Sequence, residues 1–309
     1  MSSSSGQLSA RGLVVTIALV FTAACDRPQE PPPPPAQSTS ALPAPLFANY
    51  PAEANEFRFQ WSAAQGIDLE TDPAVAVRAY LESIRLAAFA GGDPTVVYPG
   101  FLRATPENKG VSSQTGSLVQ LQYVRPRTRA EYEANGWKYV PQQVYGYQPT
   151  HVLDLVPQAD GYRATVCLGA YSVYRTAADD RSKYFSTAAD EITGQLTYGE
   201  RQAVQIWRVE LTDKNLRVGN APAAPPIPQA GPMPAPVDDV FGRWFITGAN
   251  ASVWGPIGEL EEFDTPEIRQ RCEDAMPDDA AARLAMATGF HDRPPPHGDP
   301  IPGWPSEDR

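Results

Sequence analysis

The sequence predicts an α+β fold, in which a helix packs on a curved, cone-like antiparallel sheet and a helical C-terminal extension follows. Two observations lead to this prediction. Apolar residues across 72–90 recur at three- and four-residue spacing, which is typical of a helix with one buried face. The apolar period then changes to two, and extended segments with turn signals between them continue to residue 252. A leading helix followed by a run of strands favours an antiparallel sheet over a parallel one.

The helix has clear start and stop signals. Asp72 is expected to cap it, because a side-chain oxygen at this position can accept from the first free backbone N–H groups. Pro73 suits the first turn, where its missing N–H costs nothing. Gly91 and Gly92 end the helix. We expect one face, which carries Tyr80, to be buried.

The later elements follow from the period and from turn residues. The expected strands are 118–125, 144–147, 151–157, 162–175, 203–211 and 243–252, with a short helix at 128–135. The turn at 158–161 makes a hairpin of its two flanking strands. In the strand after this turn, alternation places Tyr162, Ala164, Val166, Leu168 and Ala170 on the core face and Arg163, Thr165, Cys167, Tyr171 and Val173 on the other.

The domain organisation is predicted in five parts. They are a signal peptide (1–24), a Pro-rich stalk (25–45), the α+β domain (46–253), a helical C-terminal cover (254–289) and a disordered tail (290–309). The domain contains a Pro-rich excursion at 221–237, and the cover contains helices at 264–274 and 278–288, the first capped by Asp264. The chain has 33 Pro among 309 residues, and they gather in the stalk, the excursion and the tail. Such segments are typical of linkers and tails.

The N-terminal residues indicate export. Residues 13–24 form a continuous apolar run after Arg11, and this run is too short to span a bilayer comfortably. A short apolar run after a basic residue, ending in small residues, is typical of a signal peptide. An ordinary secreted protein and an internal core helix are the alternatives. The five consecutive prolines that follow favour polyproline II, which suits a semi-rigid stalk or a leader without a spacing role.

The three cysteines support the same interpretation. Cys25 follows the apolar run, and Cys167 and Cys272 remain as an even pair. In an oxidising compartment we expect Cys167 and Cys272 to form a disulfide, the alternative being two buried free thiols. If so, the bond ties the C-terminal cover to the second face of the sheet.

Composition excludes some partners. The formal net charge is −11, and an acidic chain repels phosphate backbones, so we expect no nucleic acid partner. No CxxC motif, zinc-type Cys/His spacing, phosphate loop, dinucleotide fingerprint or Gly-x-Ser-x-Gly elbow is present. We therefore expect no metal and no cofactor.

Two resemblances add to these observations. Thr22-Ala23-Ala24-Cys25 resembles the lipobox of bacterial lipoproteins, with Thr22 where Leu is usual, and implies lipidation at Cys25. The chain as a whole resembles envelope lipoproteins of mycobacterial-type actinobacteria, many of which are of unknown function. The element order over 70–253 resembles the cone fold of the nuclear transport factor 2-like superfamily, which includes scytalone dehydratase and polyketide cyclases. That resemblance implies a pocket between helix and sheet.

Aromatic residues are the candidates for such a pocket. Tyr and Trp crowd the strand region, and they suit sheet packing as well as ligand pockets. The possible ligand pocket is expected to include Tyr80, Tyr123, Trp137, His151 and Trp207. No catalytic residue is expected, because alternation in a regular strand would place His151 and Asp154 on opposite faces.

Three functions fit the sequence. The first is a non-catalytic, lipid-anchored extracytoplasmic domain that binds an envelope protein, a glycan or a small apolar ligand. The second is an enzyme of the dehydratase, cyclase or isomerase type that uses a cone pocket. The third is a structural lipoprotein that contacts the cell wall.

Overall fold

A computed structural model describes residues 49–110, 116–134, 136, 141–196, 199–215 and 228–306. These residues belong to a single compact unit, Pro43–Arg309. The predicted signal peptide, Cys25 and the predicted stalk lie outside the described residues. The helices are η1 (Ala52–Ala54), α1 (Ala74–Phe89), η2 (Pro94–Val96), α2 (Phe101–Ala104), η3 (Val119–Leu121), α3 (Arg129–Ala134), η4 (Gly199–Gln202), α4 (Pro266–Asp274) and α5 (Ala280–Ala287). The strands are β1 (Glu56–Ala63), β2 (Tyr145–Gln158), β3 (Gly161–Gly169), β4 (Val173–Thr176), β5 (Tyr184–Ser186), β6 (Val204–Thr212), β7 (Phe245–Ala251), β8 (Val253–Trp254) and β9 (Glu261–Glu262).

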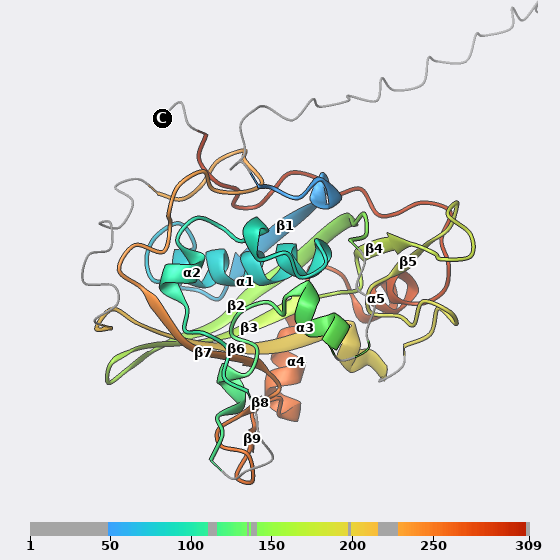
Figure 1. Ribbon diagram of the computed structural model, residues 1–309. Coiled ribbons are helices and arrows are strands. Elements are labelled where there is room, and N and C mark those ends of the chain that lie inside the picture. Colours follow the sequence, from blue (N-terminus) through green and yellow to red (C-terminus); the bar gives the residue numbers. More distant parts are fainter. Residues whose placement is uncertain are drawn as a thin grey trace, which may run out of the picture. The chain divides into compact units, whose positions relative to one another are not determined.

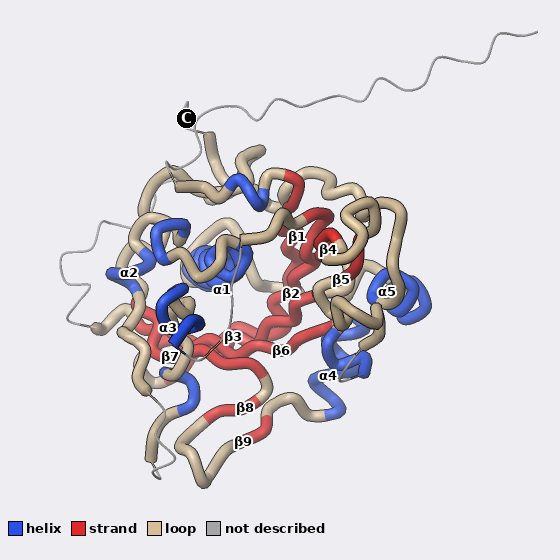
Figure 2. The backbone as a smooth tube through the Cα atoms, turned by 45° about the vertical axis from the view of Figure 1, so that its right-hand side comes forward, coloured by secondary structure: helices blue, strands red, loops and turns tan. Residues whose placement is uncertain are grey.

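The fold is α+β, as predicted. The main sheet has the strand order β5-β4-β2-β3-β6-β7, with antiparallel neighbours, and β1 pairs in parallel with β2. The sheet curls, and α1 lies across its concave side (Figures 1 and 2). The largest apolar core fills the space between them, with members from α1, β1, β3 and β6. This arrangement matches the predicted helix on a curved sheet.

Helix α1 confirms the predicted periodicity, but its start is different. Val77, Tyr80 and Leu81 are buried, as the spacing predicts. The prediction that Asp72 caps the helix is wrong, because the N-cap residue is Pro73, which has no side-chain acceptor. The helix ends at Phe89 with Ala90 as its C-cap, and Gly91 and Gly92 follow with positive φ. Positive φ is a conformation that glycine adopts without steric cost.

Most predicted strands are present. Two predicted pieces, 144–147 and 151–157, are parts of the single strand β2, and 162–175 divides into β3 and β4. The expected strand at 118–125 is wrong, because this segment contains η3. In η3 the neighbouring side chains of Gln120 and Leu121 are both buried, so burial does not alternate there as it does in a half-buried strand.

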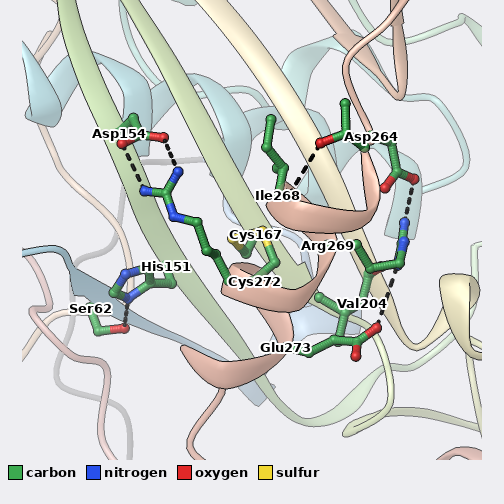
Figure 3. The surroundings of a disulfide bond; sticks show 12 residues. Ser62, His151, Asp154, Cys167, Val204, Asp264, Ile268, Arg269, Cys272 and Glu273 are labelled. Carbon is green, nitrogen blue, oxygen red and sulfur yellow. Dashed lines mark hydrogen bonds and ion pairs between the residues drawn. A yellow bond between two sulfur atoms is a disulfide. The ribbon is translucent and has the colours of Figure 1, made fainter.

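The disulfide between Cys167 and Cys272 is confirmed, with a Cα–Cα distance of 5.4 Å. Cys167 lies on the second face of β3, and Cys272 lies on α4 (Figure 3). The predicted faces of β3 hold through Leu168. They fail beyond Gly169, where the strand ends, so that Ala170 packs on the second face and Val173 packs in the main core. Closing a loop with a sequence separation of 105 stabilises the fold by about 4–5 kcal/mol in the chain-entropy treatment.

Helices α4 and α5 begin where the sequence predicts, with one change of cap. Thr265, rather than Asp264, caps α4 by accepting from the backbone N–H of Ile268. The Asp264 carboxylate instead forms an ion pair with Arg269. Asp279 caps α5 by accepting from Ala282 N–H. The apolar residues of α4 and α5 pack with Cys167 and Ile206 on the second face of the sheet, so the two helices cover it.

The tail is ordered from 290 to 306, which corrects the prediction of a disordered tail. Ile301 pairs with Gln60 of β1, and Trp304 pairs with Met233 of the Pro-rich excursion. Trp304 is 1% exposed. Proline content predicted disorder for the tail, yet the tail packs against the described part of the excursion and against α1, because the buried indole of Trp304 anchors it.

Candidate functional site

A recess of about 350 Å³ lies between α1, the segment 123–127 and β6. Its position, between the helix and the concave face of the sheet, is where the predicted pocket belongs. The lining residues are Ile84, Ala88, Gly92, Tyr123, Arg125, Pro126, Arg127 and Trp207. The volume is at the lower end of the range of about 300–1,000 Å³ that small-molecule pockets occupy.

The helix wall comes from the C-terminal half of α1. Ile84 and Ala88 are four residues apart, so they lie on the same face of the helix. Gly92 has a φ of +76°, and a Cβ atom there would lie 2.2 Å from the carbonyl oxygen of Arg127. Glycine at this position therefore allows the segment 123–127 to approach the end of the helix closely.

The segment 123–127 is anchored at several points. Tyr80 donates its hydroxyl to the carbonyl of Val124 at 3.0 Å. The Arg125 guanidinium donates to Thr105 Oγ1 at 2.9 Å and to the carbonyls of Leu102 and Thr105, each at 2.7 Å. The Tyr80 bond is buried and two of the Arg125 bonds are partly buried, so these anchors hold the wall of the recess against the core.

Tyr80 supports the recess from behind. Its ring is fully buried and stacks on Phe101 with a centroid distance of 5.8 Å. Burial raises the pKa of the Tyr80 hydroxyl, so it stays protonated and keeps its hydrogen bond to Val124.

The sheet wall is the indole of Trp207. Trp207 lies on the face of β6 that also carries Val209 and Leu211, so it packs against the main core. Its side chain is only half-buried, which leaves part of the indole facing the recess. An aromatic surface that is partly wet suits a ligand that has an apolar body.

The rim of the recess carries positive charge. The Arg127 guanidinium lies 3.7 Å from the ring centroid of Tyr123, a cation–π contact that holds both residues at the rim. The described lining includes Arg125 as well and no carboxyl or imidazole group. The nearby Glu131 carboxylate accepts from Thr128 N at 2.6 Å and from Thr128 Oγ1 at 3.0 Å. Two arginines, Arg125 and Arg127, thus belong to the lining of the recess.

The structure brings together two of the five residues predicted for the pocket. Tyr123 and Trp207 line the recess. Tyr80 lies in the core behind it, and His151 lies on the opposite face of the sheet. Trp137 lies outside the described residues. Arg125, Arg127 and Gly92 are lining residues that sequence reasoning missed; the only signal was a basic, turn-rich segment after the helix.

His151 has a different set of neighbours. Its Nδ1 lies 2.8 Å from the hydroxyl of Ser62, which is the residue opposite it on β1. Burial lowers the pKa of the His151 imidazole. The prediction that His151 and Asp154 point to opposite faces is wrong, because a β-bulge between Val152 and Asp154 shifts the register. Both side chains therefore lie on the face covered by α4 (Figure 3).

Asp154 does not bond to His151. Arg271 of α4 binds the Asp154 carboxylate through both guanidinium ends, at 3.0 and 3.3 Å. Its carboxylate is thus engaged in fastening α4 to the sheet beside the disulfide.

A second polar cluster lies inside the main core. Glu82 of α1 is 1% exposed, and its carboxyl accepts from Trp61 Nε1 at 2.7 Å, Tyr98 hydroxyl at 2.6 Å and Trp304 Nε1 at 2.8 Å. Burial raises the pKa of the Glu82 carboxyl, and the charge of Arg78 opposes that change. Three donated hydrogen bonds favour the carboxylate. Sequence reasoning did not predict this cluster.

Arg78 completes the cluster. Its guanidinium lies 4.3 Å from the Trp304 ring centroid and donates to four backbone carbonyls, those of Leu69, Gln229, Pro302 and Gly303. Two of these carbonyls belong to the tail. The cluster is therefore a structural anchor for the tail, and its bonds leave no opening toward solvent at Glu82.

Two other hollows lie among the described residues, one with a mostly polar lining and one that is very small. A recess of about 360 Å³ lies beside the start of β7 and is lined by Pro106, Glu107, Asn108, Lys109, Asn215 and Phe245. A much smaller one, about 20 Å³, lies between α5 and the start of β6. Across the described residues, no cluster of three or more His, Cys, Asp or Glu could hold a metal ion. Nor does any described helix have the length and apolar character to cross a membrane.

The fold and the recess together define an α+β domain with a partly apolar pocket, lined also by two arginines, on the concave face of a curved sheet. In comparisons with protein-family models, curated proteins and solved structures, none matches this chain.

Proposed function

We propose that this chain is a lipid-anchored extracytoplasmic domain that binds a small, largely apolar ligand in the recess between α1 and β6. The observation that carries the binding role is the half-buried indole of Trp207, which faces Ile84 and Ala88 across a recess of about 350 Å³. A partly exposed aromatic surface beside a fixed helix wall is a typical feature of small-molecule sites.

Binding fits the recess better than proton transfer does. General acid–base catalysis needs a titratable group within reach of the substrate. The described lining offers guanidinium groups, which stay protonated, aliphatic side chains and an indole. Its one hydroxyl is that of Tyr123, which accepts from Gln122 Nε2 at 2.7 Å, and the described lining places no carboxyl or imidazole group beside it. This favours a binding domain over the dehydratase, cyclase or isomerase alternative.

The binding role is tested with a neutral aromatic probe, 2-naphthylmethanol. Pro43–Arg309 forms a compact unit, so a chain beginning at residue 26 can be used in calorimetry without detergent. We expect saturable binding to one site, weakened about tenfold or more by Trp207→Ala, which removes the aromatic wall. No binding, or binding that is equally strong in Trp207→Ala, would refute the recess as the ligand site.

The anchor is tested separately at Cys25. The even pair formed by Cys167 and Cys272 supports an oxidising compartment and leaves Cys25 for lipidation. In a bacterium that processes lipoproteins, we expect the mature N-terminus to be Cys25 carrying acyl mass, and Cys25→Ala to release the protein from the membrane fraction. A mature N-terminus without acyl mass would refute the lipid anchor and would leave the binding role untouched.

A further inference from the structure

We propose that this domain docks on the surface of a neutral lipid bilayer through an apolar patch made of Ile192, Leu284 and Phe290. The inference rests on the lipid anchor of the proposed function and adds the face that the anchored domain turns toward the membrane. Ile192 is 78% exposed, Leu284 44% and Phe290 43%. The patch lies beside α5, which covers the second face of the sheet, whereas the recess lies on the concave face.

The three side chains of the patch come from segments that contact one another. Leu284 lies on α5, and Phe290 follows the end of that helix. The Gly289 N–H donates to the carbonyl of Gly194 at 2.7 Å, and a Cβ atom at Gly194 would lie 3.3 Å from Phe290 Cε2. Ile192 comes two residues before Gly194, so the turn that carries it lies against the end of α5.

That turn is held by hydrogen bonds. The Asp190 carboxylate accepts from Ile192 N at 3.1 Å, from Thr193 N at 2.8 Å and from Thr193 Oγ1 at 2.9 Å. The Gly194 N–H donates to the Asp190 carbonyl at 2.8 Å. Because the turn is already ordered, the exposed Ile192 side chain can enter an apolar phase at a low cost in conformational entropy.

The outer face of α5 carries no charge. Ala281, Leu284 and Ala285 are three and four residues apart, so they share a face of the helix, and all three are exposed. The one charged residue of α5, Arg283, is 8% exposed and donates to two backbone carbonyls. A surface helix in contact with water usually has charged and polar residues on its outer face. The apolar outer face of α5 therefore indicates contact with an apolar phase.

The charges beside the patch favour neither anionic nor cationic lipid. Asp292 pairs with Lys183, and the Asp190 carboxylate is engaged in the turn. Glu191 and Arg293, both exposed, have opposite signs. The attraction to a bilayer therefore comes from the burial of apolar area, and the net charge of −11 opposes binding to anionic lipid.

The chain enters the sheet on the side of the patch. Strand β1 starts at Glu56, which pairs with Tyr145 of β2. The Tyr145 ring packs edge-on against the Tyr184 ring at a centroid distance of 5.1 Å, and the Tyr184 N–H donates to the carbonyl of His291, the neighbour of Phe290, at 2.9 Å. Strands β1, β4 and β5 and helix α5 accordingly lie on one side of the domain (Figures 1 and 2). An anchor that precedes β1 therefore brings this side toward the membrane.

The tether makes a weak contact sufficient. Residues 25–48 are 24 residues, and a chain spans at most about 3.3–3.6 Å per residue, so the anchor holds residue 49 within roughly 80 Å of the bilayer. Docking is then an intramolecular event at a high effective concentration of membrane. A stable protein interface uses about 20–30 residues on each side, far more than this patch offers. A bilayer requires only that the three side chains reach its apolar layer.

Vesicle sedimentation tests the docking without the anchor. The chain beginning at residue 26 is mixed with phosphatidylcholine vesicles at increasing lipid concentration. We expect weak binding, with a partition coefficient about tenfold lower in the triple variant Ile192→Ser, Leu284→Ser, Phe290→Ser, which removes the apolar area of the patch. Adding phosphatidylglycerol to the vesicles should not strengthen the binding, because the chain is acidic.

Three equally apolar side chains elsewhere provide the matched control. Leu102, Val156 and Leu260 are 51%, 48% and 47% exposed and lie on other segments. The triple variant Leu102→Ser, Val156→Ser, Leu260→Ser should bind vesicles as the unchanged chain does. Circular dichroism shows whether each triple variant is folded.

Hydrogen exchange tests the same contact without substitution in the patch. Cys167 and Cys272 form a disulfide, so in a chain that begins at Cys25 this residue is the one free thiol and can be coupled to a maleimide lipid in phosphatidylcholine vesicles. We expect slower exchange in peptides that cover 190–196 and 280–291 than in the uncoupled chain. Exchange in the peptide 253–262, which contains β8 and β9, should not change.

Several outcomes would overturn the docking proposal. They are no binding to phosphatidylcholine, an equal loss in the control variant, binding only in the presence of phosphatidylglycerol, and unchanged exchange in both patch peptides. A dimer in analytical ultracentrifugation that the patch variant alone dissociates would assign the patch to a second copy of the chain and would overturn it as well. Acyl mass at Cys25 is measured in a separate experiment, so failure of the anchor and failure of the docking remain distinguishable.

Discussion

Two tryptophans beside α1 lie in opposite environments. Trp304 is 1% exposed, donates its indole N–H to Glu82 and lies against Arg78, so its ring is enclosed by the protein. Trp207 is half-buried, and part of its indole faces the recess. The tail therefore covers α1 at Arg78 and Glu82, whereas an open recess lies beside Ile84 and Ala88 of the same helix. We interpret the first region as structure and the second as function.

The largest expected effect is that of Trp304→Ala. Removing a fully buried Trp side chain costs about 3–5 kcal/mol of unfolding free energy, and here it also leaves the Glu82 carboxyl with one donor fewer. The matched variant Trp207→Ala should cost about 1–2 kcal/mol, because the indole is already partly exposed. Urea denaturation of both variants measures the difference. Equal losses would remove the distinction between the closed and the open region.

The next effect is that of Glu82→Gln. The carboxyl accepts three hydrogen bonds, and an amide offers only one acceptor oxygen, so at least one buried N–H or O–H donor would face another donor. Loss of the charge also leaves buried Arg78 without its counter-charge, and we expect a total loss of about 3 kcal/mol.

An exposed carboxylate provides the control for Glu82. Glu133 pairs with Arg129 on the surface, and Glu133→Gln should change the unfolding free energy by about 0.5 kcal/mol or less. If Glu82→Gln were as mild as this control, the cluster would not anchor the tail.

A smaller effect connects the core to the recess. Tyr80→Phe removes only the hydroxyl that binds the carbonyl of Val124, with an expected loss of about 1 kcal/mol. Because that bond holds the wall of the recess, we also expect weaker binding of 2-naphthylmethanol. Calorimetry and urea denaturation of the same sample test both parts. Unchanged affinity at lowered stability would show that the wall does not depend on this anchor.

The smallest effect lies on the second face of the sheet, away from both tryptophans. Burial lowers the pKa of His151, so the folded protein binds fewer protons than the unfolded chain just below the ordinary pKa of about 6.5. The free energy of unfolding therefore keeps its full value above pH 6.5. It decreases as the pH falls from 6.5 through the lower pKa of His151 in the folded protein. An NMR titration should give a His151 pKa below 6.5, and probe affinity should not follow this titration. A ligand affinity that titrated with His151 would contradict the separation of the two faces.

Much of the fold could be predicted from the sequence, since the period of the apolar residues changes where helix gives way to sheet. The disulfide followed from the parity of the cysteines. The bulge at Val152–Asp154 could not be predicted, because alternation assumes a regular strand. The ordered tail was missed because composition describes the average behaviour of Pro-rich segments, and one buried indole decided this case.

The candidate site was predicted in part. Aromatic residues in the strand region indicated Trp207, and the turn-rich segment supplied Tyr123. Gly92, Arg125 and Arg127 meet at the recess through a loop whose course depends on tertiary anchors such as Tyr80. The spacing of these residues along the chain does not predict that they lie close together in the fold. The lipid anchor and the resemblance to the nuclear transport factor 2-like superfamily stay predictions.

The central claim is that the recess beside Trp207 binds the ligand while the closed region beside Trp304 does not. The most direct test is an NMR titration of the six indole N–H signals with 2-naphthylmethanol, each assigned by substitution. The account predicts that the Trp207 signal shifts in a saturable manner and that the Trp304 signal stays in place. A Trp207 signal that does not move at saturating probe, or a Trp304 signal that shifts as much, would contradict the account.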